Sequence, residues 1–174
     1  MSSQGDFFET VAYAREKLFA DMRAKEKRHC PCCGHYCQYY KRKLHRVMAL
    51  DVIWLYRQHQ KTPWEFVRVQ NRKLGGRQYS ADTGDLGKLK HWQLVEQMPN
   101  LNEDKKTSGY WRITMRGIAF AQKQITVPKY ALLYLDEVIE FSEERITLAD
   151  ALPDWFSYRE LMNPSDDGWP PHWE

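Results

Sequence analysis

Two segments in the first third of the chain carry apolar residues at helical spacing. Residues 7–25 repeat apolar side chains every three or four positions, which predicts an amphipathic helix that packs on the rest of the protein or on a second subunit. A denser apolar run at residues 44–56 predicts the first helix of a globular core. Thr62 then precedes Pro63, and a glutamate completes a capping box, so a second helix is expected to run from Thr62 to Val69.

The centre of the chain alternates between helical and extended patterns. A helix is predicted over residues 82–92, and its buried face consists of apolar residues spaced by three: Leu86, Leu89 and Trp92. An extended run begins at Leu94, a polar loop covers residues 99–109, and residues 110–113 form a second strand. Thr114 is placed to cap a further helix.

The last third of the chain begins with two apolar runs and ends in a polar, aromatic segment. Residues 130–135 and 138–141 predict a β-hairpin that turns at Asp136 and Glu137, and residues 146–152 predict a short helix. From residue 153 to 174 the prolines exclude long regular structure. The tryptophans in this segment are too apolar for a tail that makes no contacts, so the tail is expected to pack back onto the body or to bind a partner.

A motif near the predicted strands points to a family. The residues that carry it are Leu94, Val95 and Glu96 after the predicted helix, then Trp111, Ile113, Thr114 and Gly117. They resemble the winged-helix family of helix-turn-helix domains, in which a recognition helix runs into a GLV-E turn, a wing and a Y-x-(L/I)-T-x-x-G return. Gln93 stands where this family usually has glycine. The resemblance covers residues 44–123 and implies DNA binding, often by a homodimer.

These patterns together predict an α+β protein built around a winged helix-turn-helix core. Its expected parts are an N-terminal amphipathic helix, a zinc-knuckle-like segment, the winged-helix domain, a β-hairpin with a short helix, and an acidic aromatic tail. Their bounds are residues 1–28, 29–43, 44–127, 128–152 and 153–174.

The charge is distributed unevenly along the chain. Residues 1–129 hold 24 Lys and Arg against 12 Asp and Glu, whereas residues 130–174 hold 2 against 11. A basic body of this kind favours a polyanion as partner. The residues expected to contact nucleic acid are Lys41, Arg42, Lys43, Arg72, Lys88, Lys90, Lys105, Lys106 and Arg112. Asp82 and Asp85 lie at the start of the predicted recognition helix and argue against simple base reading.

All four cysteines lie within the segment HCPCCGHYC, residues 29–37. Such clustering without a signal sequence favours a metal site over disulfides, and Cys30 to Gly34 match the CPxCG form of a zinc knuckle. The predicted ligands of a structural Zn²⁺ are Cys30, Cys33, Cys37 and His45. His29, Cys32 and His35 are competing ligands, ligands from a second subunit are a further alternative, and free or redox-active cysteines are competing interpretations.

Two functions from different classes fit these patterns. The first is a DNA-binding transcription regulator of a bacterium or phage. The second is a phage or mobile-element protein that inhibits a host protein, such as a polymerase or a defence nuclease of the CRISPR type, because small winged-helix proteins with zinc knuckles resemble products of such elements. An enzyme is not expected, since no catalytic motif occurs. No apolar run is long enough for a membrane span, and the N-terminus lacks an apolar signal core, so a cytoplasmic protein is expected.

Overall fold

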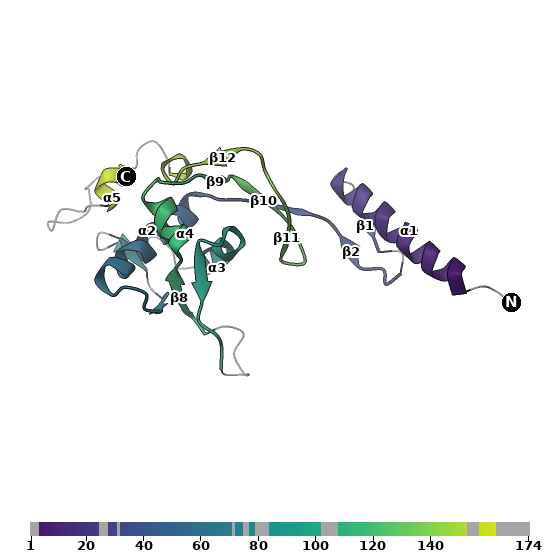
Figure 1. Cartoon of the computed structure of the whole chain (residues 1–174), viewed down its shortest axis with the longest axis horizontal. Helices are drawn as coiled ribbons and strands as arrows, with labels where there is room; N and C mark the ends of the chain where they lie inside the picture. Colours follow the sequence, from purple (N-terminus) through teal and green to yellow (C-terminus); the bar gives the residue numbers. More distant parts are fainter. Residues whose placement is uncertain are drawn as a thin grey trace. The chain divides into compact units, whose positions relative to one another are not determined.

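The chain forms helices and short strands that belong to two units (Figure 1). The computed structural model describes residues 4–24, 28–30, 32–70, 72–74, 77–78, 84–101, 108–152 and 157–162. Within these residues it contains five α-helices and several small antiparallel sheets, which confirms the expected α+β class. Unit 1 consists of Met1–Arg42 and Leu132–Glu140, and unit 2 consists of Lys43–Ala131 and Phe141–Glu174.

Unit 1 begins with a long helix beside a two-stranded hairpin. Helix α1 (Gln4–Arg23) confirms the helix predicted for residues 7–25. Strands β1 (Arg28–His29) and β2 (Tyr36–Cys37) are antiparallel, so that the segment rich in cysteine lies in the turn between them. Arg28 Nε lies 3.1 Å from Asp21 Oδ2 and connects the hairpin to the helix.

A second hairpin completes unit 1. Strands β10 (Tyr130–Tyr134) and β11 (Glu137–Phe141) form a three-stranded sheet with β3 (Tyr40–Lys43), in the order β11–β10–β3. Leu135 and Asp136 have φ values of 49° and 66°, the left-handed pair that a tight two-residue hairpin turn requires. The predicted hairpin is therefore confirmed, although its turn lies one residue earlier than the sequence indicated.

The core of unit 2 is built on helix α2 (Arg46–Lys61). Its residues from Met48 to Tyr56 are all buried, which confirms the apolar helix predicted for this region. Asp51 lies in the middle of that run and is itself fully buried. A buried carboxylate has to be paired, and its partner is described below.

The helix predicted from Thr62 to Val69 is wrong. Thr62 caps the C-terminal end of α2, and the chain then turns and enters strand β4 (Val67–Arg68). Proline is common just after a helix end as well as at a helix start, so Pro63 marks the end of α2 here. The β-branched valines that follow suit the strand, which pairs with β8.

The predicted recognition helix is shorter and less regular than expected. Helix α3 (Gly84–Lys88) continues into a 3-10 helix, η1 (Leu89–Trp92). Leu86, Leu89 and Trp92 are buried, as their spacing predicted. The segment ends at Gln93, which adopts a left-handed conformation with φ 58°. Glycine fits such a conformation most readily, so a glutamine is strained at this position.

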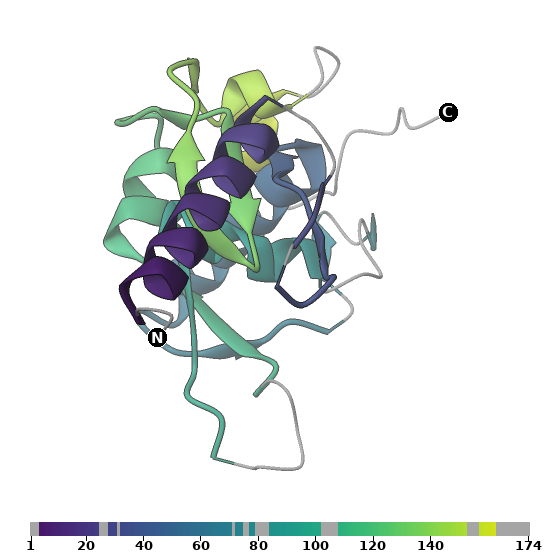
Figure 2. The ribbon, with the colours of Figure 1, turned by 90° about the vertical axis from the view of Figure 1, so that its right-hand side faces the viewer.

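Two strands and a helix follow η1 directly. Strands β7 (Val95–Gln97) and β8 (Tyr110–Ile113) are antiparallel, and the sheet order is β4–β8–β7. Helix α4 (Met115–Ala121) then begins at Thr114, whose hydroxyl accepts a hydrogen bond from the N–H of Gly117 at 3.0 Å, so the predicted cap is confirmed. Figures 1 and 2 show the β7–β8 pair projecting away from α2 and α4.

Short elements complete unit 2. The helix predicted for residues 146–152 is only partly correct, because strand β12 (Arg145–Ile146) precedes a single 3-10 turn, η2 (Ala149–Ala151). Strand β9 (Val127–Pro128) pairs with β12, and β5 (Lys73–Leu74) pairs with β6 (Arg77–Gln78).

One short helix of the predicted tail is described, and it packs on the body of unit 2. This helix is α5 (Tyr158–Met162), in which Leu161 is buried. The hydroxyl of Tyr158 donates to the carbonyl of Ala121 at 2.5 Å, and the Lys123 ammonium lies 4.2 Å from the centre of the tyrosine ring. Packing of the tail onto the body is confirmed for these residues, and the tail's other aromatic residues lie outside the described residues.

Candidate nucleic-acid interface and cysteine hairpin

Lysine side chains of α3 and η1 make up the first part of the candidate interface. The three buried apolar residues fix this segment, and the Trp92 indole donates to the carbonyl of Pro128 at 2.7 Å. Lys90 is exposed on η1. Lys88 Nζ lies 2.8 Å from Asp85 Oδ1, so its positive charge is partly offset within the segment. The acidic start of this helix thus serves in part as an internal ion-pair partner.

His45 lies beside the same carboxylate. Its Nε2 atom is 3.6 Å from Asp85 Oδ2. Burial lowers the pKa of His45, and the Asp85 charge acts against that shift. His45 belongs to unit 2 and the cysteines belong to unit 1. Its role as a fourth zinc ligand stays a prediction.

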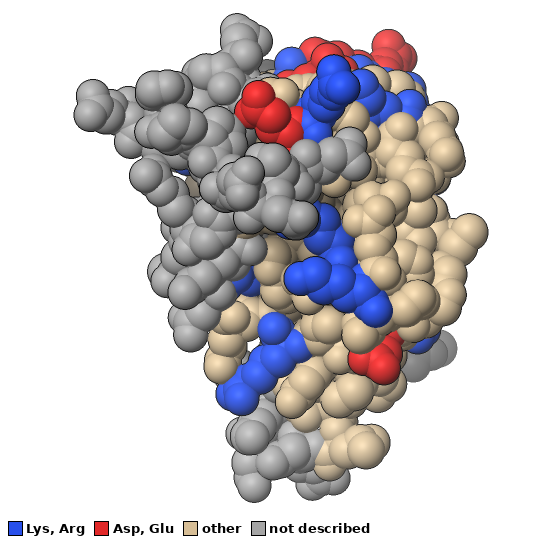
Figure 3. Space-filling model, turned by 90° about the vertical axis from the view of Figure 1, so that its left-hand side faces the viewer, with Lys and Arg blue, Asp and Glu red and all other residues tan. Residues whose placement is uncertain are grey.

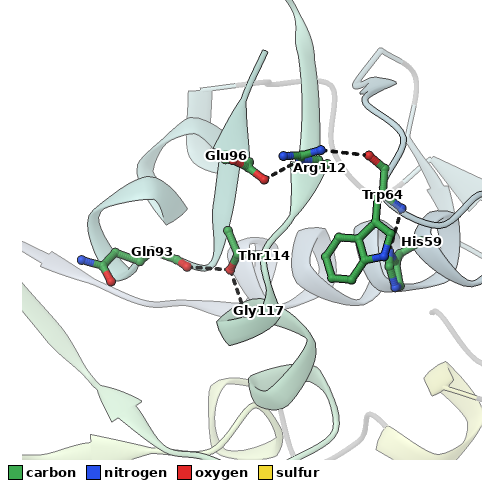
Figure 4. A network of polar contacts seen from close by, with 7 residues as sticks. All are labelled: His59, Trp64, Gln93, Glu96, Arg112, Thr114 and Gly117. Atoms are coloured by element: carbon green, nitrogen blue, oxygen red, sulfur yellow. Dashed lines mark hydrogen bonds and ion pairs between the residues drawn. The ribbon is translucent and has the colours of Figure 1, made fainter. Parts of the chain in front are cut away.

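Arg112 on β8 is held by three neighbours, two of which, Glu96 and Trp64, are drawn in Figure 4. Its guanidinium forms an ion pair with Glu96 on β7 and donates to the carbonyl of Trp64 at 3.2 Å. The same group lies 4.4 Å from the centre of the Phe66 ring, within the range of a cation–π contact. Arg112 is therefore a fixed, partly exposed cation on the sheet.

Trp64 is an exposed aromatic residue in an unusual backbone conformation. Its φ is 66°, which for a bulky side chain costs about 1–3 kcal/mol. Its N–H donates to His59 Nδ1 at 3.2 Å, and its ring lies edge-on to the His59 ring at 4.5 Å. The two hydrogen bonds hold the backbone of Trp64, the His59 ring contacts its indole, and 46% of the residue remains exposed. Strained backbone conformations of this kind cluster at functional sites in proteins.

Arg72 was expected to contact nucleic acid, and the structure contradicts this. The side chain is only 1% exposed, and its Nε atom lies 2.8 Å from Asp51 Oδ1 in the core of unit 2. Its Nη1 atom also donates to the carbonyl of Val69 at 3.2 Å. The buried carboxylate of α2 requires a cation, and Arg72 supplies it, so the residue acts in folding.

The remaining residues that were expected to contact nucleic acid lie on β3 or outside the described residues. Lys41, Arg42 and Lys43 lie on β3 and are exposed. Lys105 and Lys106 lie outside the described residues. Figure 3 shows one face of the molecule, on which Lys and Arg side chains run through the middle among uncharged residues, with Asp and Glu side chains at the top and lower right. The middle of this face is therefore basic.

The cysteine segment forms a tight turn between β1 and β2. The N–H of Cys30 donates to the carbonyl of His35 at 2.7 Å, and the N–H of Gly34 donates back to the carbonyl of Cys30 at 2.8 Å. Gly34 has φ 70°, a conformation that glycine adopts without steric cost. Backbone hydrogen bonds from Cys33 and then Cys32 lower the pKa of the Cys30 thiol. Such a turn favours a thiolate at Cys30.

Tyr134 of the second hairpin reaches this turn within unit 1. Its hydroxyl lies 3.5 Å from the Sγ atom of Cys37, which is buried. That hydrogen bond, together with burial, raises the pKa of Tyr134 to about 12. Aromatic rings of Phe19 and Tyr39 lie edge-on to the Tyr134 ring at 6.2 and 6.0 Å. Tyr134 therefore anchors the cysteine turn to its surroundings.

The described residues contain no preformed metal cage. No group of three His, Cys, Asp or Glu side chains among them is arranged to hold a metal ion. His29, one competing ligand, directs Nδ1 to the carbonyl of Gly34 at 3.0 Å, and its ring lies edge-on to the Tyr36 ring at 5.5 Å. None of the helices in the described part of the chain has the length and apolar character that a bilayer crossing demands.

Sequence reasoning missed several residues that matter at these sites. It did not single out Trp64, Phe66 or Tyr110 as surface residues, because aromatic side chains are usually assigned to a core. It also missed Tyr134, which the alternation of buried and half-buried residues along β10 places on the less buried face.

Comparisons of the chain with protein families, with curated proteins and with solved structures gave no match.

Proposed function

We propose that this protein binds duplex DNA through unit 2, used as a winged-helix domain. The observation that carries the proposal is the order of elements from α3 to α4. A helix with a buried stripe at Leu86 and Leu89 runs into the antiparallel pair β7–β8, whose connection contains a polar, lysine-bearing loop, and α4 follows at once. This is the order of helix, strand, wing and strand that the resemblance implies.

Charge supports the same proposal. Residues 43–129, which carry α2 to α4, hold 16 Lys and Arg against 7 Asp and Glu, whereas residues 141–174 of unit 2 hold 2 against 8. The excess in the first segment attracts a polyanion, and phosphate contacts account for most of the affinity of a non-specific complex. Lys90 and the lysines of the loop are then expected phosphate contacts, and the contributions of Lys88 and Arg112 are reduced because carboxylates pair with them. Sequence-specific reading by this short helix is not part of the proposal.

The proposal is tested by measuring affinity for a duplex oligonucleotide at increasing salt. With about five phosphate contacts, log affinity should fall against log salt with a slope of about −4 to −5. Lys90→Ala should make the slope shallower by about one, and Lys17→Ala on α1 is the matched control that should leave it unchanged. A slope near zero, or no binding at low salt, would show that the protein is not an electrostatic duplex binder.

A second candidate function is the inhibition of a host protein. It is favoured by the internal pairing of Lys88 with Asp85 and of Arg112 with Glu96, which removes charge that a DNA binder would use. Affinity purification from a bacterial lysate, with and without nuclease, separates the two functions. A stoichiometric protein partner that survives nuclease, with no duplex binding by the pure protein, would favour the inhibitor.

We also propose a structural Zn²⁺ in the cysteine hairpin, held by Cys30, Cys33 and Cys37, with His45 as the predicted fourth ligand. The support is the turn itself. Its glycine at φ 70° and its paired backbone hydrogen bonds bring two cysteines, separated by two residues, to the same end of a hairpin. Thiolates are preferred zinc ligands, and a closed set of four makes a site structural. The metal would hold this short hairpin together.

A further inference from the structure

The outer face of the β4–β8–β7 sheet carries alternating aromatic and cationic residues. Side chains two apart on a strand point the same way, so Tyr110 and Arg112 lie opposite the buried Trp111 and Ile113. Cross-strand partners share a face, and the register pairs Arg68 with Tyr110 and Glu96 with Arg112. The outer face therefore presents Arg68, Tyr110, Arg112 and Glu96.

Two further aromatic residues extend this face. The Phe66 ring lies under the Arg112 guanidinium, 4.4 Å away, and Trp64 joins the edge of the face through the hydrogen bond from Arg112 to its carbonyl. Phe66 is thus a covered ring, Tyr110 on β8 is 37% exposed, and Trp64 beside the sheet is 46% exposed, with its indole against His59. We call this set of residues the outer platform: Trp64, Phe66, Arg68, Tyr110 and Arg112.

Hydrogen bonds hold the backbone that carries the exposed rings of the outer platform. His59 and Arg112 hold the backbone of Trp64 in a conformation that a bulky residue rarely adopts, and the His59 ring lies edge-on to the indole (Figure 4). The N–H of Tyr110 donates to Ser108 Oγ at 3.3 Å, and that hydroxyl donates to the carbonyl of Met98 at 2.8 Å. Backbone held in this way loses little conformational entropy when a flat partner stacks on the rings that it carries.

The charges around these rings select the partner. Arg68 is exposed and makes no ion pair with the described residues, and Arg112 is partly exposed beside Glu96. Glu65 lies three residues before Arg68 and likewise makes no ion pair within the described part of the chain. Exposed aromatic rings beside arginines suit a ligand that offers flat π faces joined by negative charges. Bases in a duplex are already stacked on each other, so unpaired bases fit best.

We propose that the outer platform binds single-stranded nucleic acid, with unpaired bases stacked on Trp64 and Tyr110 and phosphates beside Arg68. This site shares Arg112 with the residues assigned to duplex DNA above, but its aromatic rings lie outside that assignment and it does not require it. The expected preference is for bases in general and not for a sequence, because every base has a π face.

The test measures binding of the full chain to three labelled ligands by fluorescence anisotropy. They are a thymidine oligonucleotide of about 12 nucleotides, a chain of equal length without bases, and a duplex. We expect the base-free chain to bind about tenfold more weakly than the oligonucleotide. Trp64→Ala and Tyr110→Ala should each weaken oligonucleotide binding about 5- to 100-fold and leave duplex binding within about twofold.

Two variants serve as controls. Trp64→Phe keeps a stacking ring and should retain most of the affinity, whereas Tyr13→Ala removes an aromatic side chain on α1 that is 69% exposed and should change nothing. Thermal unfolding of each variant identifies any that fail to fold. Because Tyr110→Ala removes an exposed ring from a paired strand, it is expected to fold even if Trp64→Ala does not.

The outcomes for the two sites can be told apart. Equal binding of the base-free chain and the oligonucleotide, or Tyr110→Ala affinity within about twofold of wild type, would overturn the stacking proposal whatever the duplex result. Oligonucleotide binding that depends on Trp64 and Tyr110, without any duplex binding, would uphold the outer platform and refute the proposed duplex function.

Discussion

Gly117 sits where helix α4 touches the backbone that leaves η1, and replacing it tests the packing of the core of unit 2. A Cβ atom at this position would lie 2.1 Å from the carbonyl oxygen of Leu94 and 2.6 Å from Cγ1 of Ile113. The first of these contacts is with backbone, which cannot rotate away. In Gly117→Ala, helix α4 therefore has to move away from the start of β7.

Movement of α4 would strain three hydrogen bonds that tie it to this junction. The N–H of Thr114 donates to the Leu94 carbonyl at 3.1 Å, and its hydroxyl donates to the carbonyl of Gln93 at 2.7 Å. Arg116 Nε donates to the carbonyl of Trp92 at 3.0 Å. Overpacking and weakened hydrogen bonds together cost about 3–4 kcal/mol, and the higher helix propensity of alanine returns about 1 kcal/mol. The expected net loss is about 2–3 kcal/mol in the free energy of unfolding.

Urea denaturation followed by tryptophan fluorescence measures this loss, because all seven tryptophans belong to unit 2. Gly87→Ala is the matched control. Its added Cβ would meet the Trp111 ring at 3.6 Å, an ordinary contact, so this helical variant should be unchanged or more stable by up to about 1 kcal/mol. If Gly117→Ala proved as stable as wild type, the close approach of α4 to Leu94 would be refuted.

Further predictions concern the backbone, the core and the metal. Gln93→Gly should raise the free energy of unfolding by about 0.5–1 kcal/mol in the same urea assay, because φ 58° is strained for glutamine; a loss of stability would argue against that conformation. Arg72→Ala should cost about 3–5 kcal/mol by leaving the buried carboxylate of α2 unpaired, and a loss below about 1 kcal/mol would contradict the buried pair. Elemental analysis should find about one zinc per chain in the wild type and in Cys32→Ser, but little in Cys33→Ser; equal zinc in both variants would reject the proposed ligand set.

Sequence patterns predicted the elements whose signal is local and strong. The apolar run of α2, the cap at Thr114 and the hairpin β10–β11 were all found in this way. The segment after Thr62 failed because the same proline marks both helix starts and helix ends. The length of α3 was overestimated because two glycines lower helix propensity within a segment that tertiary packing holds in a tighter 3-10 turn.

Site residues were harder to predict than elements, because their surroundings come from distant parts of the chain. Arg72 looked like one more surface cation, and its true role depends on Asp51, which lies 21 positions earlier. A lone carboxylate within the apolar run of α2 was the signal that could have identified this pair. Trp64 gave no such signal, since neither its left-handed backbone nor its contact with Arg112 follows from local sequence.

The path of the chain between the two units limits how the protein can be divided. The chain leaves unit 1 after Arg42, returns to it at Leu132 and leaves again after Glu140. Cutting the gene after residue 42 would place Tyr134 on a different fragment from Cys37, Tyr39 and Phe19. The β10–β11 hairpin would then lose these contacts within its own fragment. A shortened version of unit 2 therefore needs a new loop in place of residues 132–140, and co-expressed fragments split at residue 42 should reassociate.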